Sequence, residues 1–480
     1  MNGRRTDGTR ALAVSVVIPA HNRSTALRNG LRSLRTQTLA RDAFEVVVVD
    51  DGSEPPLSGE VSDLVDGDHV RLVRHDSALG AGAARNTGAA AARGELLVFL
   101  DVDCLCHPDL LSAHLGAQAG GPVAVCGYAG GRETTPAAWR MALGDDWDFA
   151  DAEATFARAA RTPALHDPLT ELLAVPRPAD WAFFWTLNVS VPRSAFDLVG
   201  GFNRDFEVKG CEDLELGYRL AKAGFPTVFA PDAITIHQPH ERDRNAEVVR
   251  DRRNEHVLVR AYPTVEVEAV CSYDIANSRE LVPAVERFAE GLVAETSDCA
   301  HLGRLPRLVE RIAASGRVLL VGAPAGWPEH LRGHTTVCYP SDVGPQRHLR
   351  LLGTRIPVED GHFDLGVLTD YWRQFPERTV SRVLAEMHRT CRDVLVLSGV
   401  SGTPVERPDQ DLAAALAAHD HPYWEFTVRL RRELHQFDLA EWERGGQGTT
   451  AFRCAPIDWP TAELGGNTAV AVEEGPCARW

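Results

Sequence analysis

The chain has 480 residues, more than one ordinary domain holds, so two or three domains are expected. Hydrophobic residues make up 44% and charged residues 24%, which excludes a wholly disordered, collagen-like or coiled-coil chain. Acidic residues outnumber basic ones by 67 to 50, for a formal net charge of −17. This charge argues against a dedicated nucleic-acid binder and against attraction to an anionic membrane surface.

Targeting signals are weak throughout the chain. No apolar run reaches the roughly 18 residues that a membrane span needs, and residues 11–20 are too short and poorly flanked for a signal peptide. The ten cysteines are scattered, without the density of a secreted disulfide framework. We therefore expect a cytoplasmic protein with reduced thiols and no integral membrane segment.

In the first half, β-branched apolar runs alternate with helical patterns. Strands are predicted at residues 14–19, 44–49, 70–73 and 96–100, with a first helix that Ser24 caps and a second at 82–92. Further along the chain we predict cleft-lining loops and short helices (130–180), a helix (212–223) stopped by Gly224, strands (227–229 and 234–236) and a charged helix (241–256). Continuous apolar strands separated by helices indicate a mostly parallel sheet covered on both faces.

The second half shows another α/β pattern. Strands are predicted at 317–321, 335–339, 363–368 and 394–397, with a crossover helix at 380–387. The predicted domains are a flexible N-terminus (1–12), a first α/β domain (13–265), a helical linker (266–310) and a Rossmann-like domain (311–480).

The second domain is similar to a class I methyltransferase core, but only loosely. Gly322 and Gly326 are spaced more widely than in the usual adenosylmethionine loop, and Pro324 stiffens the segment between them. Three interpretations stay open. A degenerate module for acceptor binding or dimerisation is favoured over an active methyltransferase and a purely structural cap.

Carboxylates follow the strand at 96–100, where Asp101 and Asp103 stand at i and i+2. Both can reach one ligand as the chain leaves the strand, and oxygen ligation suits Mg²⁺ or Mn²⁺. The alternative is a loop start with two solvated acids. His237, at another strand end, is either a structural histidine or a further metal ligand beside Asp103.

Other strand ends and helix starts carry polar groups with two interpretations each. Asp51 either accepts a hydrogen bond from a uracil-like base or begins an aspartate-glycine turn. Arg85 and Asn86 near a helix start either meet phosphate or form an ordinary helix entry. Glu212 and Asp213 open a helix, either as acids favoured by its dipole or with one of them as general base.

Taken together, the motifs resemble the family 2 glycosyltransferases with the GT-A fold, over roughly residues 13–240. The segments that carry the resemblance are VSVVIPAHNR, VVVVDDGS, GAGAARNTGAAAARGELLVFLDVD, GGFNRDFEVKGCEDLELGYRLAKAGF and PDAITIHQPH. The resemblance implies an inverting transferase that uses a nucleotide-sugar donor, most often a UDP-sugar, with Mn²⁺ or Mg²⁺. In the absence of membrane spans, the acceptor hydroxyl or thiol is expected on a soluble small molecule, saccharide or peptide.

The resemblance also implies residue roles. The nucleotide site comprises Pro19, Ala20, His21, Asn22 and Arg23, with Asp51 at the base and Arg85 and Asn86 near ribose or phosphate, while Asp101 forms the D-x-D motif of the donor site with Asp103. Asp103 and His237 would hold the metal, Asp213 beside Glu212 would be the general base, and Trp181, Trp185 and Asn188 would contact sugar or acceptor. His21 departs from the family, which usually has Tyr or Phe there.

Two competing functions stay open. They are a bifunctional glycosyltransferase and methyltransferase, and a non-catalytic scaffold that binds a nucleotide sugar. A sugar nucleotidyltransferase would need a glycine-rich, lysine-bearing loop after the first strand, which PAHNRS lacks. A homodimer formed through the second domain also stays open, and so do the donor sugar and the acceptor. Cys104 and Cys106 lack a second pair at zinc-ligand spacing, so we expect them to be core or loop cysteines.

Overall fold

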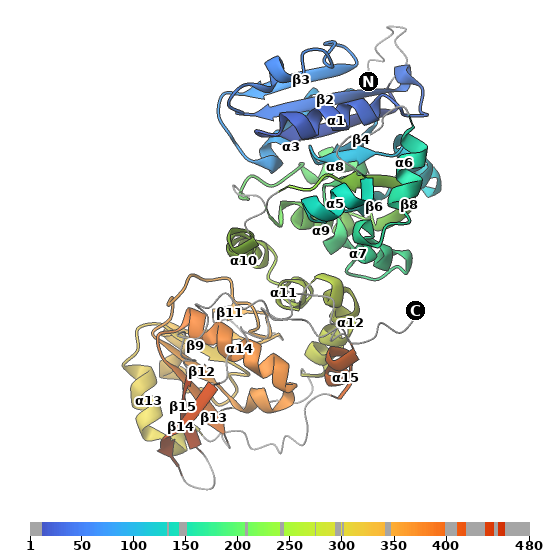
Figure 1. Ribbon diagram of the computed structural model, residues 1–480. Helices are drawn as coiled ribbons and strands as arrows, with labels where there is room; N and C mark the ends of the chain where they lie inside the picture. The colour runs from blue at the N-terminus through green and yellow to red at the C-terminus, as the bar shows by residue number, and fades with distance from the viewer. Residues whose placement is uncertain are drawn as a thin grey trace, which may run out of the picture.

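The structure is a computed structural model, and it shows two β-sheets, one in each half of the chain (Figure 1). It describes residues 12–131, 134–143, 151–206, 210–240, 244–273, 275–292, 299, 302–340, 347–398, 410–418, 437–445 and 450–456. The predicted α/β class is confirmed, with one sheet in each half of the chain. The predicted flexible N-terminus lies, except for its last residue, outside the described residues.

The first sheet has eight strands in the order β3-β2-β1-β4-β7-β6-β8-β5. These are β1 (Val14–Ala20), β2 (Phe44–Asp51), β3 (Val70–His75), β4 (Leu96–Leu100), β5 (Cys104–Cys106), β6 (Ala124–Gly130), β7 (Asn188–Pro192) and β8 (Thr227–His237). Strands β1 to β4 pair in parallel, but β7 runs antiparallel to both β4 and β6, and β5 runs antiparallel to β8. The sheet is therefore mixed, and the two short strands predicted near residue 230 are one strand, β8.

Helices connect these strands. They are α1 (Ser24–Leu34), α2 (Leu57–Glu60), α3 (Ala81–Ala91), α4 (Leu110–Ala117), α5 (Pro136–Leu143), α6 (Ala152–Ala159), α7 (Pro168–Glu171), α8 (Arg193–Val199) and α9 (Glu212–Lys222). Helix α1 buries Leu27, Leu31 and Leu34, as its periodicity predicts. The prediction that Ser24 caps α1 is wrong, because Ser24 is the first helical residue and no side chain caps the helix. Gly224 follows α9 at a φ of 91°, which favours glycine.

The second sheet has the order β11-β10-β9-β12-β13-β15-β14. Its strands are β9 (Val318–Val321), β10 (Thr335–Cys338), β11 (His348–Leu349), β12 (Leu365–Leu368), β13 (Val394–Ser398), β14 (Phe437–Arg444) and β15 (Thr450–Pro456). The helices of this half are α13 (Pro306–Ala313), α14 (Glu377–Thr390) and α15 (Gln410–Ala418). The first five strands are parallel, and β15 runs antiparallel to both of its neighbours.

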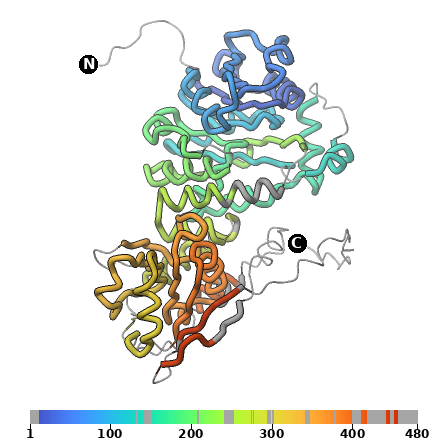
Figure 2. The backbone as a smooth tube through the Cα atoms, turned by 90° about the vertical axis from the view of Figure 1, so that its left-hand side faces the viewer, coloured from blue at the N-terminus to red at the C-terminus, as the bar shows by residue number. Residues whose placement is uncertain are grey.

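Helices α10 (Arg244–Ala261), α11 (Val265–Ser272) and α12 (Ile275–Gly291) lie between the two sheets (Figures 1 and 2). One continuous cluster of buried apolar side chains runs from Leu214 on α9 through Val267 on α11 to Val318 on β9. The carboxylate of Glu268 on α11 also accepts hydrogen bonds from four consecutive backbone N–H groups at residues 352–355. The segment predicted as a linker is thus packed into a shared core, while the domain boundaries themselves stay predictions.

Gly322, which follows β9, lies against other protein groups. It has a φ of 128°, and a Cβ there would stand 2.0 Å from Oγ1 of Thr369. The neighbouring rings of Tyr339 and Tyr371 are buried and lie 5.4 Å apart between their centroids. Close packing at the ends of β9 and β12 therefore explains the glycine without a ligand. Among the described residues, no helix is both long enough and apolar enough to cross a membrane.

Candidate active site

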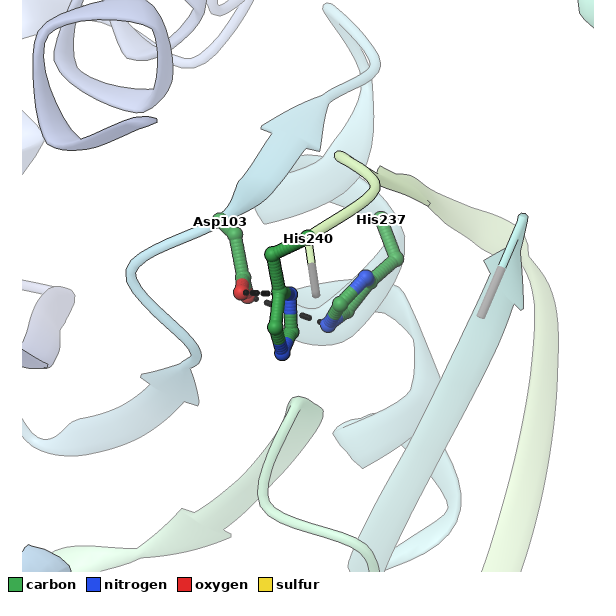
Figure 3. Close-up of side chains that lie close together, drawn as sticks. All are labelled: Asp103, His237 and His240. Carbon is green, nitrogen blue, oxygen red and sulfur yellow. Dashed lines mark ion pairs between the residues drawn. The ribbon is translucent and has the colours of Figure 1, made fainter. Parts of the chain in front are cut away.

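Asp103, His237 and His240 meet at one edge of the first sheet (Figure 3). The pairing of β5 with β8 places Cys104 opposite His237, so Asp103 comes to lie beside the end of β8. The backbone N–H of Gln238 then donates to the carbonyl of Asp103 at 2.8 Å. Two segments more than 130 residues apart are thereby held together by backbone hydrogen bonds.

The three side chains face one another closely. His237 Nε2 lies 3.1 Å from Oδ1 of Asp103, and His240 Nδ1 lies 3.1 Å from Oδ2 of the same carboxylate. One ligand atom from each residue falls within 4.8 Å of the other two. Burial works to raise the pKa of Asp103, but the facing imidazoles hold it well below its usual value. Asp103 and His237 were predicted to come together, whereas His240 was missed.

The signal for His240 was present in the quoted segment PDAITIHQPH, where two histidines stand three residues apart after a strand. In an extended or turning segment this spacing has no fixed geometry, so the sequence alone did not place His240 beside Asp103. Cys104 and Cys106, by contrast, are buried on β5 as expected, and burial raises the pKa of the Cys106 thiol to about 12.

The second part of the site is the turn into α9. Cys211 precedes the helix with a φ of 61°, a left-handed conformation that is uncommon for a residue other than glycine. Glu212 Oε2 accepts the backbone N–H of Gly210 at 2.6 Å, and Asn254 on α10 donates to the Gly210 carbonyl at the same distance. The start of α9 is therefore held from both sides, which sets the direction of Asp213.

Asp213 is partly exposed, but its carboxyl is surrounded by protein. Its Oδ1 accepts the N–H of Leu214 at 2.9 Å, and its Oδ2 lies 3.4 Å from the N–H of Thr186. Burial, followed by the charge of Glu212, raises the pKa of Asp213 to about 7, while the positive charge of Arg85 acts to lower it. A carboxyl with this pKa takes up and releases protons near neutral pH, as a general base must.

Arg85 on α3 links the two parts of the site. It is 1% exposed, and it donates to Asp101 at 2.8 Å and to Glu212 at 3.0 Å. Burial opposes its charge, but Asp101, Glu212 and Asp213 together hold its pKa above the usual value. The expected contact with phosphate does not fit this position, because the guanidinium is enclosed and already faces two carboxylates. Arg85 instead connects the end of β4 to the start of α9 through its ion pairs with Asp101 and Glu212.

The predicted nucleotide-site residues gather where β1, β2 and β3 end. His21 Nδ1 lies 2.7 Å from the carbonyl of Asp51, and Asn22, at a φ of 53°, donates its backbone N–H to Ser53 Oγ. Pro19, Ala20 and Arg23 flank them, with Ala20 buried at the strand end and the other two half-buried.

The carboxylate of Asp51 already contacts several polar groups of the protein. It contacts His75 Nδ1 at 2.7 Å and accepts the N–H groups of Leu79 and Gly80, each at 2.9 Å. Since a carboxylate has about four acceptor positions, roughly one is left for a base. Asn86 uses its amide oxygen and nitrogen on the backbone of Phe202, at 2.8 and 2.9 Å, and so anchors a loop.

Two of the predicted sugar or acceptor contacts lie in the interior. Asn188 is 2% exposed, and its amide contacts His114 and the carbonyls of Tyr128 and Ala233. Trp181 is 1% exposed, and its indole N–H donates to Glu266 Oε1 at 2.8 Å. Both predictions are therefore corrected, because apolar packing and satisfied hydrogen bonds leave these side chains no open face. Trp185 is only partly buried and stays a candidate.

Comparisons with known proteins bear on this site. The family model "Glycosyl transferase family 2" matches residues 15–166. The validoxylamine A glucosyltransferase of Streptomyces hygroscopicus subsp. limoneus is 32% identical over 385 residues, which are 74% of this chain and 84% of that protein. The protein of the same name from S. hygroscopicus subsp. jinggangensis (strain 5008) is 36% identical over 390 residues, 74% of this chain and 90% of its own.

Among solved structures, the mannosyltransferase PcManGT from Pyrobaculum calidifontis, in complex with GDP-Man and Mn²⁺, is similar at a TM-score of 0.39 and 21% identity, covering 64% of this chain and 81% of that one. The sequence relatives extend well beyond the segment that the family model matches. With these relatives, the predicted family is confirmed. The chain belongs to glycosyl transferase family 2 and is a glycosyltransferase.

Proposed function

We propose that this glycosyltransferase works by inversion, with a divalent metal ion, and moves a sugar from a nucleotide-sugar donor to a hydroxyl of a soluble acceptor. The observation that carries the proposal is Asp213, a partly exposed carboxyl whose pKa is raised to about 7. It stands one residue from Glu212, which Arg85 joins to Asp101 at the metal side of the site.

The cluster of Asp103, His237 and His240 fits a divalent ion. Oδ1 of Asp103 is buried and has no partner in hydrogen-bond geometry, although an imidazole nitrogen stands 3.1 Å away. Two ligands of one metal ion can lie this close without a hydrogen bond between them. In a simple ion pair, the imidazole N–H would instead point at the carboxylate oxygen. An ion bound there would neutralise negative charge on a departing diphosphate.

Asp213 would take the proton from the acceptor hydroxyl as it attacks the anomeric carbon. Glu212 is unsuited to a nucleophilic role, since its two oxygens are held by Arg85 and by the N–H of Gly210. With Glu212 paired to Arg85, Asp213 is left as the single candidate base, which favours one displacement that inverts the anomeric configuration. Arg85 would keep the two carboxylates that it joins at a constant separation while the donor binds.

The relatives direct the choice of substrates. Because two of them are named validoxylamine A glucosyltransferases, we propose glucose as the transferred sugar and validoxylamine A as the first acceptor to test. A UDP-linked donor is the first choice from the family resemblance, with GDP-linked glucose as the comparison. Asp51, which has about one acceptor position left for a base N–H, would help to distinguish them.

The test uses the purified full-length chain with Mn²⁺, nucleotide-activated glucose and validoxylamine A. We expect a glucoside whose anomeric configuration, measured by NMR, is opposite to that of the donor, and we expect excess chelator to abolish its formation. A product of retained configuration would refute the inverting mechanism, and formation indifferent to chelator would refute the metal role. Donor binding without turnover of any acceptor would favour the non-catalytic scaffold.

A further inference from the structure

We infer that His240 is a third protein ligand of the metal site, so that the free protein binds a transition-metal ion such as Mn²⁺ without nucleotide and discriminates against Mg²⁺. This inference rests on the proposed metal dependence and adds a ligand and a metal preference to it. A site made of one carboxylate and one histidine would instead depend on the donor's phosphates to complete the metal's coordination.

The distances match those of neighbouring ligands around one ion. Ligands at right angles with bonds of about 2.1–2.2 Å stand about 3 Å apart. Asp103 lies 3.1 Å from a nitrogen of each imidazole, through a different carboxylate oxygen in each case. In Figure 3 both imidazole rings face the carboxylate of Asp103, and the centroids of the two rings lie 5.4 Å apart.

The segment between the two histidines is anchored, so the arrangement is built before any metal binds. Gln238 donates its backbone N–H to the Asp103 carbonyl at 2.8 Å, and its side chain contacts the Ala26 carbonyl at 3.2 Å and Asn29 at 2.9 Å, both on α1. Side chains held in position lose less conformational entropy when they bind a ligand. Preorganisation of this kind raises the affinity for the ion.

The chemistry of the ligands sets the metal preference. Imidazole nitrogen favours the first-row transition metals, whereas Mg²⁺ prefers oxygen ligands and keeps several of its waters. The side chains of Asp103, His237 and His240 are only 8%, 5% and 18% exposed. A largely dry site with two imidazoles therefore disfavours Mg²⁺ more than a site with a single histidine would.

The experiment measures Mn²⁺ binding to the full-length chain after chelator treatment, in the absence of nucleotide. The loss of the six-line electron paramagnetic resonance signal of free Mn²⁺ gives the dissociation constant, and Mg²⁺ is then added as competitor. The variants are His240→Gln and, as a matched control, His166→Gln, whose exposed ring pairs with Glu171 and not with a residue of the cluster. Circular dichroism confirms that each variant is folded.

We expect the wild type and His166→Gln to bind one Mn²⁺ equally and to resist displacement by equimolar Mg²⁺. His240→Gln should bind Mn²⁺ at least about tenfold more weakly, since even groups that only orient a ligand are worth 10–100-fold. A smaller loss, or no binding by the wild type until a nucleoside diphosphate is added, would overturn the inference. If Mn²⁺-dependent glucosyl transfer is still observed, either result refutes the role of His240 without refuting the proposed function.

Discussion

Replacing Asp213 by asparagine removes the proposed proton acceptor and preserves the shape of the side chain. The amide oxygen can still accept the N–H of Leu214, which the carboxylate accepts at 2.9 Å. Donor binding should be unchanged, because Arg85 and Glu212 keep their contact. General base catalysis contributes about 10²–10⁴-fold, so we expect kcat to fall by that factor, a rise in the barrier of about 3–5 kcal/mol.

The same substitution should stabilise the protein. The pKa of Asp213 is raised from 3.8 to about 7, so the folded state disfavours its charge. From about pH 4 to pH 7 the unfolded chain carries the charge and the folded protein does not, and the wild type therefore loses stability as the pH rises. At pH 8, Asp213→Asn should raise the free energy of unfolding by roughly 1–4 kcal/mol, since each pKa unit corresponds to about 1.4 kcal/mol.

Three measurements test this reasoning. The wild-type kcat/KM should rise with pH through a midpoint of about 7, so that at pH 6 about a tenth of the enzyme holds Asp213 ionised. The variant's kcat and its urea unfolding at pH 8 are compared with those of Asp197→Asn, an exposed control on α8. The reasoning fails if Asp213→Asn retains more than about a tenth of the wild-type kcat, or if it is less stable than the control at pH 8.

The remaining predictions concern residues that the structure places in the interior. Arg85→Met should lower both kcat and the free energy of unfolding, the latter by about 3–5 kcal/mol, because it removes the ion-pair partner of the buried carboxylate of Glu212. Urea denaturation measures the change, and unchanged stability would contradict this role of Arg85. Trp181→Phe should leave the KM for the acceptor unchanged. The lost hydrogen bond to Glu266 should lower the free energy of unfolding by about 1 kcal/mol. An altered KM would restore Trp181 as an acceptor contact. Glu268→Gln should speed hydrogen–deuterium exchange at residues 352–355, whose N–H groups it holds, and protection equal to wild type would refute that role.

Much of the first half could be predicted from local patterns. Strands such as Val14–Ala20 and Leu96–Leu100 are continuous apolar runs, and such runs form buried strands whatever their partners are. Asp103 lies in the short turn after the strand Leu96–Leu100, and Asp213 is the second residue of the helix Glu212–Lys222, so both places could be predicted from position along the chain. The mixed sheet could not be predicted, because the pairing of strands distant in sequence leaves no local signal.

The sequence by itself determined the family, the α/β class and the short segments that carry Asp103, His237 and Asp213. Only the tertiary structure decided which side chains meet: His240 lies beside Asp103 and His237 because β5 pairs with β8, and Arg85 contacts two carboxylates. Trp181, predicted at the acceptor, is covered by packing instead. The reason is that secondary structure depends on neighbours along the chain, whereas burial, pKa and metal ligation depend on groups brought together from distant segments.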